Sequence, residues 1–294
     1  MKKCILLCGP PGSGKTTLAK SLIHDDGDHG LATVYVNQDS QKKEHIAIFD
    51  EAIFAGKDVV VDRMGFSKEQ RSRYLTLAKE HGYETEIKIL HLPYIDCLNR
   101  MRLRKDHETI NNEESAKSAL KTFFTKYERP ADDEADVVTR IFPSRPDDRK
   151  AIIVDLDNTL CNASKREHHV RNGNRNWKAF FEEIPTDTVN QWCADIILRS
   201  RMDHMIIFCS GRPEEYRQIT QDWLWKHLPE LKASYLFMRQ SGDFRKDSIV
   251  KEILLDYEIL PRYEPFYFID DRKQVVQMYR QRGYTVLQCQ EGDF

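Results

Sequence analysis

The sequence of 294 residues lacks the features of several large protein classes. No apolar run approaches the length of a membrane span, and the first residues lead straight into an apolar segment without a signal peptide. The seven cysteines form no Cys-X-X-Cys pair and no zinc-ligand spacing, so we expect reduced thiols that pack as small apolar groups. The net charge of −2 indicates no general affinity for nucleic acid, although a local basic groove is compatible with it. We therefore expect a cytoplasmic protein without a membrane partner.

The composition that is present is typical of two α/β domains. With 40% hydrophobic and 31% charged residues, the chain can bury substantial cores, and its length favours two domains. Strand-like and helix-like segments alternate in both halves, and a stretch rich in proline and charge separates them. We predict two doubly wound parallel-sheet domains, residues 1–142 and 150–294, with a linker over 143–149 and sites at the carboxyl ends of the strands.

The elements that we expect follow from the apolar runs and their period. Strands are expected at 4–8, 32–37, 59–62, 86–92, 151–155, 205–209, 235–238, 265–269 and 285–287. Helices are expected at 17–23, near 43–55, from Ser67 as N-cap, and near 95–105, 113–127, 188–200, 214–227, 246–255 and 274–282.

The stretch from Gly9 to Thr16 reads Gly-Pro-Pro-Gly-Ser-Gly-Lys-Thr, between the first strand and the first helix. This is the context of a phosphate-binding loop, in which backbone N–H groups and a helix N-terminus face phosphate oxygens. Lys15 would reach the β- and γ-phosphates, and the Thr16 hydroxyl would hold Mg²⁺. We predict that the loop binds ATP or another nucleoside triphosphate through Gly9, Gly12, Ser13, Gly14, Lys15, Thr16 and Thr17.

Further residues could complete a phosphoryl-transfer site. Asp39 follows the second strand and could take a proton from an acceptor hydroxyl, or could simply cap a turn. Asp62 ends the third strand and is expected near Mg²⁺ and Lys15. Arg100 and Arg104 lie four residues apart, so a helix would aim both at a transferring phosphoryl group or at solvent.

A second motif, Asp155-Leu156-Asp157-Asn158-Thr159, follows the first strand of the second half. It is the signature of haloacid-dehalogenase-type phosphatases. Asp155 would attack phosphorus, and Asp157 would protonate the leaving hydroxyl and later activate water. Three further stretches follow in that family's order and supply the other groups of the site: Ser210 and Lys251 for the non-bridging oxygens, and Asp155, the Asp157 carbonyl and Asp270 or Asp271 for Mg²⁺. The roughly fifty residues between Asp157 and Ser210 are too few for a separate cap domain, which favours an open site that admits a polymer end.

The two motif sets together resemble the phage-type bifunctional polynucleotide 5′-kinase/3′-phosphatases from end to end. The resemblance implies transfer of the ATP γ-phosphate to a 5′-OH end of DNA or RNA, removal of a 3′-phosphate or 2′,3′-cyclic phosphate, and a polynucleotide ligase that acts downstream. It implies a bacterial or phage-infected cell as the location and is compatible with a homo-oligomer. It also implies roles for single residues: Asp39 as base, Arg104 as the transition-state arginine, Lys42 on an acceptor phosphate, and Arg212, Asp247 and Lys251 in the phosphatase site.

The same resemblance places an essential phosphatase arginine after the first motif. Arg175 fits best, and Arg166 or Arg171 could serve instead. Two other functions stay open from the residues alone. One is a small-molecule kinase fused to a nucleotide or sugar phosphatase, and the other is a nucleotide-dependent nucleic-acid-binding or scaffolding protein with residual chemistry.

Overall fold

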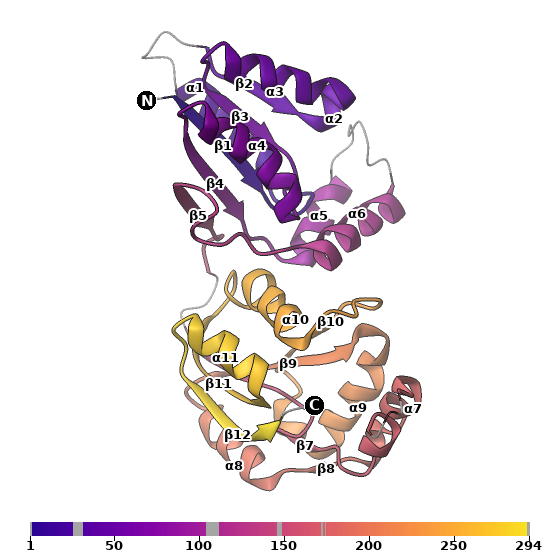
Figure 1. The fold of residues 1–294 in the computed structure, drawn as a ribbon. Coiled ribbons are helices and arrows are strands. Elements are labelled where there is room, and N and C mark those ends of the chain that lie inside the picture. Colours follow the sequence, from indigo (N-terminus) through magenta and orange to yellow (C-terminus); the bar gives the residue numbers. More distant parts are fainter. Residues whose placement is uncertain are drawn as a thin grey trace. The chain divides into compact units, whose positions relative to one another are not determined.

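A computed structural model describes residues 2–25, 32–103, 112–145, 149–171, 173 and 175–292. The chain divides into two compact units, Met1–Pro143 and Ser144–Phe294, which are described separately (Figure 1). Arg104, which the sequence assigns to the first site, lies outside the described residues.

The first unit is built on a parallel sheet with the strand order β2-β3-β1-β4-β5. Its strands are β1 (Lys3–Cys8), β2 (Val34–Asn37), β3 (Val59–Asp62), β4 (Glu84–Leu90) and β5 (Val137–Ile141). The β-branched run of β3 is buried throughout, as its composition predicts for a strand inside a parallel sheet. β5 was not expected, because its residues are partly exposed at the sheet edge and give no continuous apolar run.

Helices connect the strands of this sheet (Figure 1). They are α1 (Lys15–Asp25), α2 (Gln38–Gln41), the 3₁₀ turn η1 (Lys42–Glu44), α3 (His45–Phe54), α4 (Lys68–Glu80), α5 (Tyr94–Leu103) and α6 (Glu113–Lys126). Ser67 caps α4 by accepting the Gln70 N–H, as predicted. The helix expected near 43–55 is present as α3, which begins at His45 after η1, whereas the short helix α2 was not expected. α2 begins directly after β2, and Lys42, with φ 50°, separates it from the later turns.

The second unit has a parallel sheet in the order β10-β9-β6-β11-β12. Its strands are β6 (Lys150–Val154), β9 (Met205–Pro213), β10 (Tyr235–Arg239), β11 (Glu264–Arg272) and β12 (Val286–Gly292). A short antiparallel pair, β7 (Cys161–Asn162) and β8 (Thr188–Val189), stands apart from it. Both chain halves are therefore parallel-sheet α/β domains, which confirms the predicted fold class.

The helices of the second unit are α7 (Trp177–Glu182), α8 (Gln191–Ser200), α9 (Arg217–His227), α10 (Asp247–Leu254), the π-helical turn η6 (Leu255–Ile259) and α11 (Lys273–Gln281). Short 3₁₀ turns are η2 (Glu167–His169), η3 (Ile184–Thr186), η4 (Glu214–Tyr216) and η5 (Pro229–Leu231). The helix expected at 188–200 begins three residues later, because Thr188 and Val189 pair with β7 instead.

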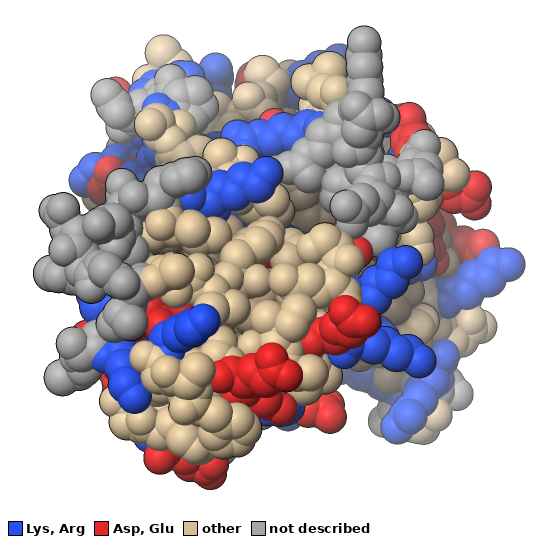
Figure 2. Space-filling model, turned by 90° about the horizontal axis from the view of Figure 1, so that it is seen from above, with Lys and Arg blue, Asp and Glu red and all other residues tan. Residues whose placement is uncertain are grey.

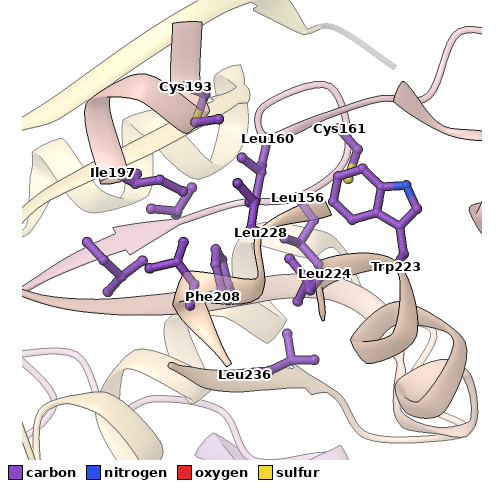
Figure 3. Packing of buried hydrophobic residues seen from close by; sticks show 14 of the residues in the cluster. Leu156, Leu160, Cys161, Cys193, Ile197, Phe208, Trp223, Leu224, Leu228 and Leu236 are labelled. Atoms are coloured by element: carbon purple, nitrogen blue, oxygen red, sulfur yellow. The ribbon is translucent and has the colours of Figure 1, made fainter. Parts of the chain in front are cut away.

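A buried core fixes the loop that follows β6. Leu156 and Leu160 are fully buried and pack with Phe208 of β9 and Trp223 of α9 (Figure 3). Burying a leucine side chain contributes about 1.5–3 kcal/mol, so these two anchors hold the turn firmly. Leu156 lies between Asp155 and Asp157, and the position of both carboxylates therefore depends on this core.

The surface carries charges of both signs. Figure 2 shows Lys and Arg interspersed with Asp and Glu around an area of uncharged residues on one face. All seven cysteines are free thiols, and six of them are buried. Among the residues that the structure describes, no helix is long and apolar enough to cross a bilayer.

Candidate active sites

The phosphate loop links β1 to α1 and depends on glycine. Gly12 (φ 83°) and Gly14 (φ 103°) adopt left-handed backbone conformations. A Cβ at Gly12 would lie 2.6 Å from the Cys97 carbonyl oxygen of α5, so the loop packs too closely there for any side chain. A Cβ at Gly14 would lie 3.9 Å from Arg100 Nη1, which places that guanidinium beside the loop.

Lys15 is folded back into this loop. Its Nζ donates to the carbonyl oxygens of Gly9 (2.9 Å) and Pro10 (2.8 Å). Burial lowers the pKa of Lys15, while Asp62 and, more weakly, Asp39 act in the opposite direction. Lys15, Asp39 and Asp62 therefore lie within one electrostatic neighbourhood, at the carboxyl ends of β1, β2 and β3.

Asp62 is the centre of a hydrogen-bond network at the ends of these strands. Its Oδ2 accepts from Thr16 Oγ1 (2.7 Å), Tyr35 OH (2.8 Å) and Asn37 Nδ2 (3.0 Å). Burial, together with the Asp62 charge, raises the pKa of Tyr35. The carboxylate and the Thr16 hydroxyl form an oxygen donor set of the kind that Mg²⁺ prefers. Sequence reasoning did not predict that Tyr35 and Asn37 would contact Asp62.

Asp39 and Lys42 lie on the short turns after β2. The Asn37 side chain caps α2 by accepting the N–H of Asp39 (2.8 Å) and of Ser40 (3.1 Å). This cap leaves the Asp39 carboxylate exposed. Lys42 is also exposed, and its carbonyl accepts from the ring of the buried His45. The first site thus combines a phosphate loop, an exposed carboxylate and two exposed cations, Lys42 and Arg100.

In the second unit, Lys251 is the centre of a buried carboxylate cluster. Its Nζ donates to Asp155 Oδ1 (2.7 Å) and Asp270 Oδ2 (2.8 Å), and lies 3.5 Å from Asp247 Oδ2. Burial alone would lower the pKa of Lys251, but the three carboxylates raise it well above its ordinary value. The ends of β6 and β11 and the first turn of α10 are thereby brought together, as the order of the motifs predicts.

Glycine at position 211 lets α10 approach β9. A Cβ there would lie 2.1 Å from Asp247 Oδ1, which a protein cannot accommodate without displacing the carboxylate. Asp247 is further bound by Arg239 Nη2 (3.1 Å) and lies 3.7 Å from Arg272 Nη1. Ser210, fully buried, accepts the Arg212 N–H (3.2 Å).

Asp157 is held by two buried arginines. Arg212 donates through Nη2 to Asp157 Oδ1 (2.6 Å) and through Nε to Oδ2 (3.0 Å), and Arg166 Nη2 also contacts Oδ1. Burial alone would raise the pKa of Asp157, but Arg212 and Arg166 outweigh it and hold this pKa well below its usual range.

A buried carboxylate that the sequence did not indicate, Asp187, positions both guanidiniums. It accepts from Arg166 Nε (2.7 Å) and Nη2 (2.8 Å) and from Arg212 Nη2 (3.3 Å). Its own carbonyl accepts from Trp223 Nε1 (3.0 Å). The bidentate geometry fixes the plane of the Arg166 guanidinium, which a single point charge would not do.

The three candidate arginines after the first motif are now distinguishable. Arg166 is fully buried in the network with Asp157, whereas Arg175 is exposed and Arg171 pairs with Glu167 (2.9 Å). The structure therefore places Arg166, and not the favoured Arg175, among the groups of the site. The preference for Arg175 rested on the family resemblance, and the longer loop left Arg166 and Arg171 open because the sequence does not reveal that the chain turns back at η2.

Substitution of these arginines should separate the two assignments. We expect Arg166→Lys to lower kcat for a phosphomonoester about 10²–10³-fold, because lysine keeps the charge but loses the fork shared by Asp157 and Asp187. Arg175→Lys should have a far smaller effect on kcat. Steady-state kinetics, with thermal melts to confirm folding, would check this. An equal loss in both variants would contradict the placement of Arg166.

Asp155, Asp270 and Asp271 form a crowded acidic group. One carboxylate oxygen from each lies within 4.8 Å of the others, and all three residues are buried. Burial and mutual repulsion raise the pKa of Asp155 and of Asp270, and they raise that of Asp271 to about 7. An all-oxygen cluster of this kind, with more negative charge than Lys251 neutralises, fits a hard divalent cation.

The same crowding predicts how stability depends on pH without a divalent cation. Because the pKa values of these three carboxyls are raised, the folded domain retains protons that an unfolded aspartate releases at about pH 4. These retained protons stabilise the folded domain fully below about pH 4. The stabilisation is lost as the pH rises through the pKa of Asp271, which is about 7. Asp157, whose pKa is lowered, acts in the opposite sense and only under more acidic conditions.

We therefore expect the Tm of the second unit in EDTA to fall between about pH 5 and pH 7.5, by about 2–4 °C for each kcal/mol lost. Mg²⁺ should raise the Tm more at the higher pH, because it replaces the protons. Calorimetry at both pH values, with and without Mg²⁺, measures this difference. A rise in Tm that is equal at the two pH values would contradict the assignment of the acidic group as a metal site.

Two family models match the chain. Residues 149–294 match the polynucleotide kinase PNKP phosphatase domain, and residues 4–130 match an AAA domain. The chain thus joins a P-loop kinase domain to a PNKP-type phosphatase domain, the combination that its motifs predict. This pair of domains implies a nucleotide as phosphate donor and a metal ion.

Individual relatives are similar over most of the chain. A candidate bifunctional polynucleotide kinase/RNA ligase of Autographa californica nuclear polyhedrosis virus is 28% identical over an alignment of 310 residues. That alignment covers 95% of this chain but only 41% of the viral protein, so the chain spans about two fifths of its relative's length. A structure of the Pnkp1/Rnl/Hen1 RNA repair complex is matched over 100% of this chain and 97% of that chain, with 23% identity and a TM-score of 0.42. A fungal RNA kinase is matched over 88% and 98%, with 17% identity and a TM-score of 0.40.

Proposed function

We propose that this protein heals broken polynucleotide ends. Its kinase domain would transfer the γ-phosphate of ATP to a 5′-OH end in DNA or RNA, and its phosphatase domain would remove a 3′-phosphate or a 2′,3′-cyclic phosphate. The observation that carries the proposal is the PNKP-type phosphatase domain with Asp155 against Lys251, joined to a phosphate loop with Lys15 near Asp39.

In the kinase reaction, the Asp39 carboxylate takes the proton of the 5′-hydroxyl as that oxygen attacks the γ-phosphorus. The bond to the β–γ bridging oxygen breaks and ADP leaves. Lys15 would exchange the Gly9 and Pro10 carbonyls for the β- and γ-phosphates, and Arg100 and Arg104 would stabilise the charge on the transferring group. Lys42 would bind a phosphate of the acceptor. Thr16 and Asp62 would hold Mg²⁺, which when bound neutralises phosphate charge.

In the phosphatase reaction, an oxygen of Asp155 attacks phosphorus and the bond to the 3′-oxygen breaks. Asp157 gives that oxygen a proton and then takes one from the water that hydrolyses the aspartyl-phosphate. Ser210 and Lys251 would hold the non-bridging phosphate oxygens, with Asp247 beside Lys251. Asp155, the Asp157 carbonyl, and Asp270 or Asp271 would hold Mg²⁺.

The low pKa of Asp157 adds a condition to this scheme. With Arg166 and Arg212 bound to it, Asp157 is in the basic form that the hydrolysis step needs. To act first as an acid it must lose part of that stabilisation. An incoming phosphate dianion would compete with Asp157 for the two guanidiniums and so raise the pKa of Asp157.

The experiment compares acceptors and substrates directly. Labelled phosphate transfer from ATP should be faster to a 5′-OH oligonucleotide than to nucleosides or sugars, and phosphate release should be faster from a 3′-phosphate oligonucleotide than from free nucleotides or sugar phosphates. No transfer to the oligonucleotide would favour the alternative, a small-molecule kinase fused to a metabolite phosphatase. A downstream ligase, a cytoplasmic location and a homo-oligomer stay predictions.

A further inference from the structure

A basic segment of the phosphatase domain runs from β7 into α7. Residues 163–178 contain five Lys or Arg residues and one acidic residue, Glu167. Lys165, Arg171, Arg175 and Lys178 are exposed, whereas Arg166 is buried against Asp157 and Asp187. The segment therefore carries positive charge on its solvent side and an active-site arginine on its inner side.

The segment folds back on itself, so that the residues near His169 and those near Asn176 lie together. The N–H of Asn176 donates to the carbonyl of His169 (3.0 Å), and His169 Nε2 lies 3.0 Å from Glu183 Oε1 at the end of α7. Acidic neighbours offset only part of the charge. Arg171 pairs with Glu167 (2.9 Å), and Lys178 lies 3.7 Å from Glu182. The Lys178–Glu182 pair is exposed on both sides and therefore weak, so Lys178 can turn to a stronger anion.

Trp177 presents an aromatic surface within the same segment. Its side chain remains 51% exposed, although its ring stacks on Phe181 (6.0 Å between centroids) and meets the edge of Phe180 (5.7 Å). Phe180 in turn lies under the Arg166 guanidinium at 4.1 Å, and its carbonyl accepts from Arg166 Nη1 (3.2 Å). Trp177 is thus packed rigidly against the support of the active-site arginine, with part of its ring open to solvent.

We propose that this surface binds the single strand that leads to the 3′-phosphate. Lys165, Lys178 and the arginines beside them contact phosphodiesters, and Trp177 stacks on a base. Charge with an interleaved, rigid aromatic ring is the combination that single-stranded nucleic acid requires. Because Trp177 packs on Phe180, and Phe180 on Arg166, a strand bound to this surface would lead to the active site. α7 is labelled in Figure 1. The inference rests on the proposed function.

The test compares variants of the surface with matched controls elsewhere on the domain. Lys165→Ala/Lys178→Ala and Trp177→Ala are paired with Lys226→Ala/Lys232→Ala and Trp192→Ala, whose side chains are also exposed. Each protein hydrolyses a 3′-phosphorylated single-stranded oligonucleotide and a nucleoside 3′-monophosphate over a series of salt concentrations. The ratio of kcat/KM for the two substrates is the readout, because the monophosphate lacks the upstream phosphodiesters and bases that the surface would contact.

We expect Trp177→Ala to lower this ratio about tenfold through KM of the oligonucleotide, with partial rescue in Trp177→Phe. The lysine variant should reduce the dependence of log KM on log salt by about 0.7 for each phosphate that the surface no longer binds. Variants that match their controls in ratio and salt slope, in an enzyme that does act on the oligonucleotide, would overturn the surface alone. A wild-type enzyme that cleaves the monophosphate but not the oligonucleotide would overturn the proposed function as well.

Discussion

Asp155→Asn should abolish phosphate release from 3′-phosphate ends, with kcat lowered at least about 10⁴-fold, and leave kinase activity intact. The amide keeps the shape of the side chain but has no charged oxygen to attack phosphorus. The fold should tolerate the change. Asp155 is one of several buried carboxylates around Lys251, and removing one of them relieves repulsion while Asp270 still accepts from Lys251 (2.8 Å).

The measurement is phosphate release under single-turnover conditions, with a thermal melt of each protein. Asp203→Asn provides the matched control, because Asp203 is an exposed carboxylate in the turn after α8. It should behave as wild type. Phosphatase activity that survives in Asp155→Asn would mean that another group attacks phosphorus, and the aspartyl-phosphate scheme would be wrong.

Lys15→Ala should lower kcat of the kinase by about 10²–10³-fold or more and leave the phosphatase unchanged. The loss has two causes. The ammonium that would neutralise the β- and γ-phosphates disappears, and the loop loses the bonds from Lys15 to the Gly9 and Pro10 carbonyls. Because burial lowers the pKa of Lys15, the free ammonium is held at some cost, which phosphate charge would offset.

Lys20→Ala is the control for this variant, since Lys20 lies on the same helix and is exposed. Labelled transfer from ATP to a 5′-OH oligonucleotide gives the rate, and equilibrium binding of ATP shows whether affinity falls as well. If Lys15→Ala transferred phosphate at the wild-type rate, the phosphate loop would not be the donor site.

The sequence indicates where a candidate site residue lies in the fold when its motif stands at the end of a strand. Parallel strands bring their carboxyl ends to one edge, so a run such as Val154-Asp155 or Ile269-Asp270 reveals the position of its acid without further information. For the same reason Lys15, Asp39 and Asp62 were assigned together from their places after β1, β2 and β3. The network around Asp62 confirms that strand order 2-3-1 brings Thr16 and Asp62 into contact.

The sequence could not predict contacts that depend on how a long connection turns. Arg166 and Asp187 are 21 residues apart, and they meet only because η2 folds the chain back and η3 ends beside α9. Asp187 has no motif around it, and nothing in the sequence distinguishes it from a surface aspartate. The sequence did not predict β5 for another reason. An edge strand is half exposed and therefore lacks the apolar run that reveals a central strand.

The most direct test of the account uses one RNA that carries a 5′-OH and a 3′-phosphate, incubated with ATP and Mg²⁺. Tandem mass spectrometry then assigns each phosphate to one end, because the starting RNA and the product of both reactions have the same mass. The wild type should add a phosphate at one end and remove one from the other. Lys15→Ala should give only the 3′-hydroxyl product, and Asp155→Asn only the 5′-phosphate product. A variant that lost both reactions, or lost the opposite one, would contradict the claim that each domain contains its own independent phosphoryl-transfer site.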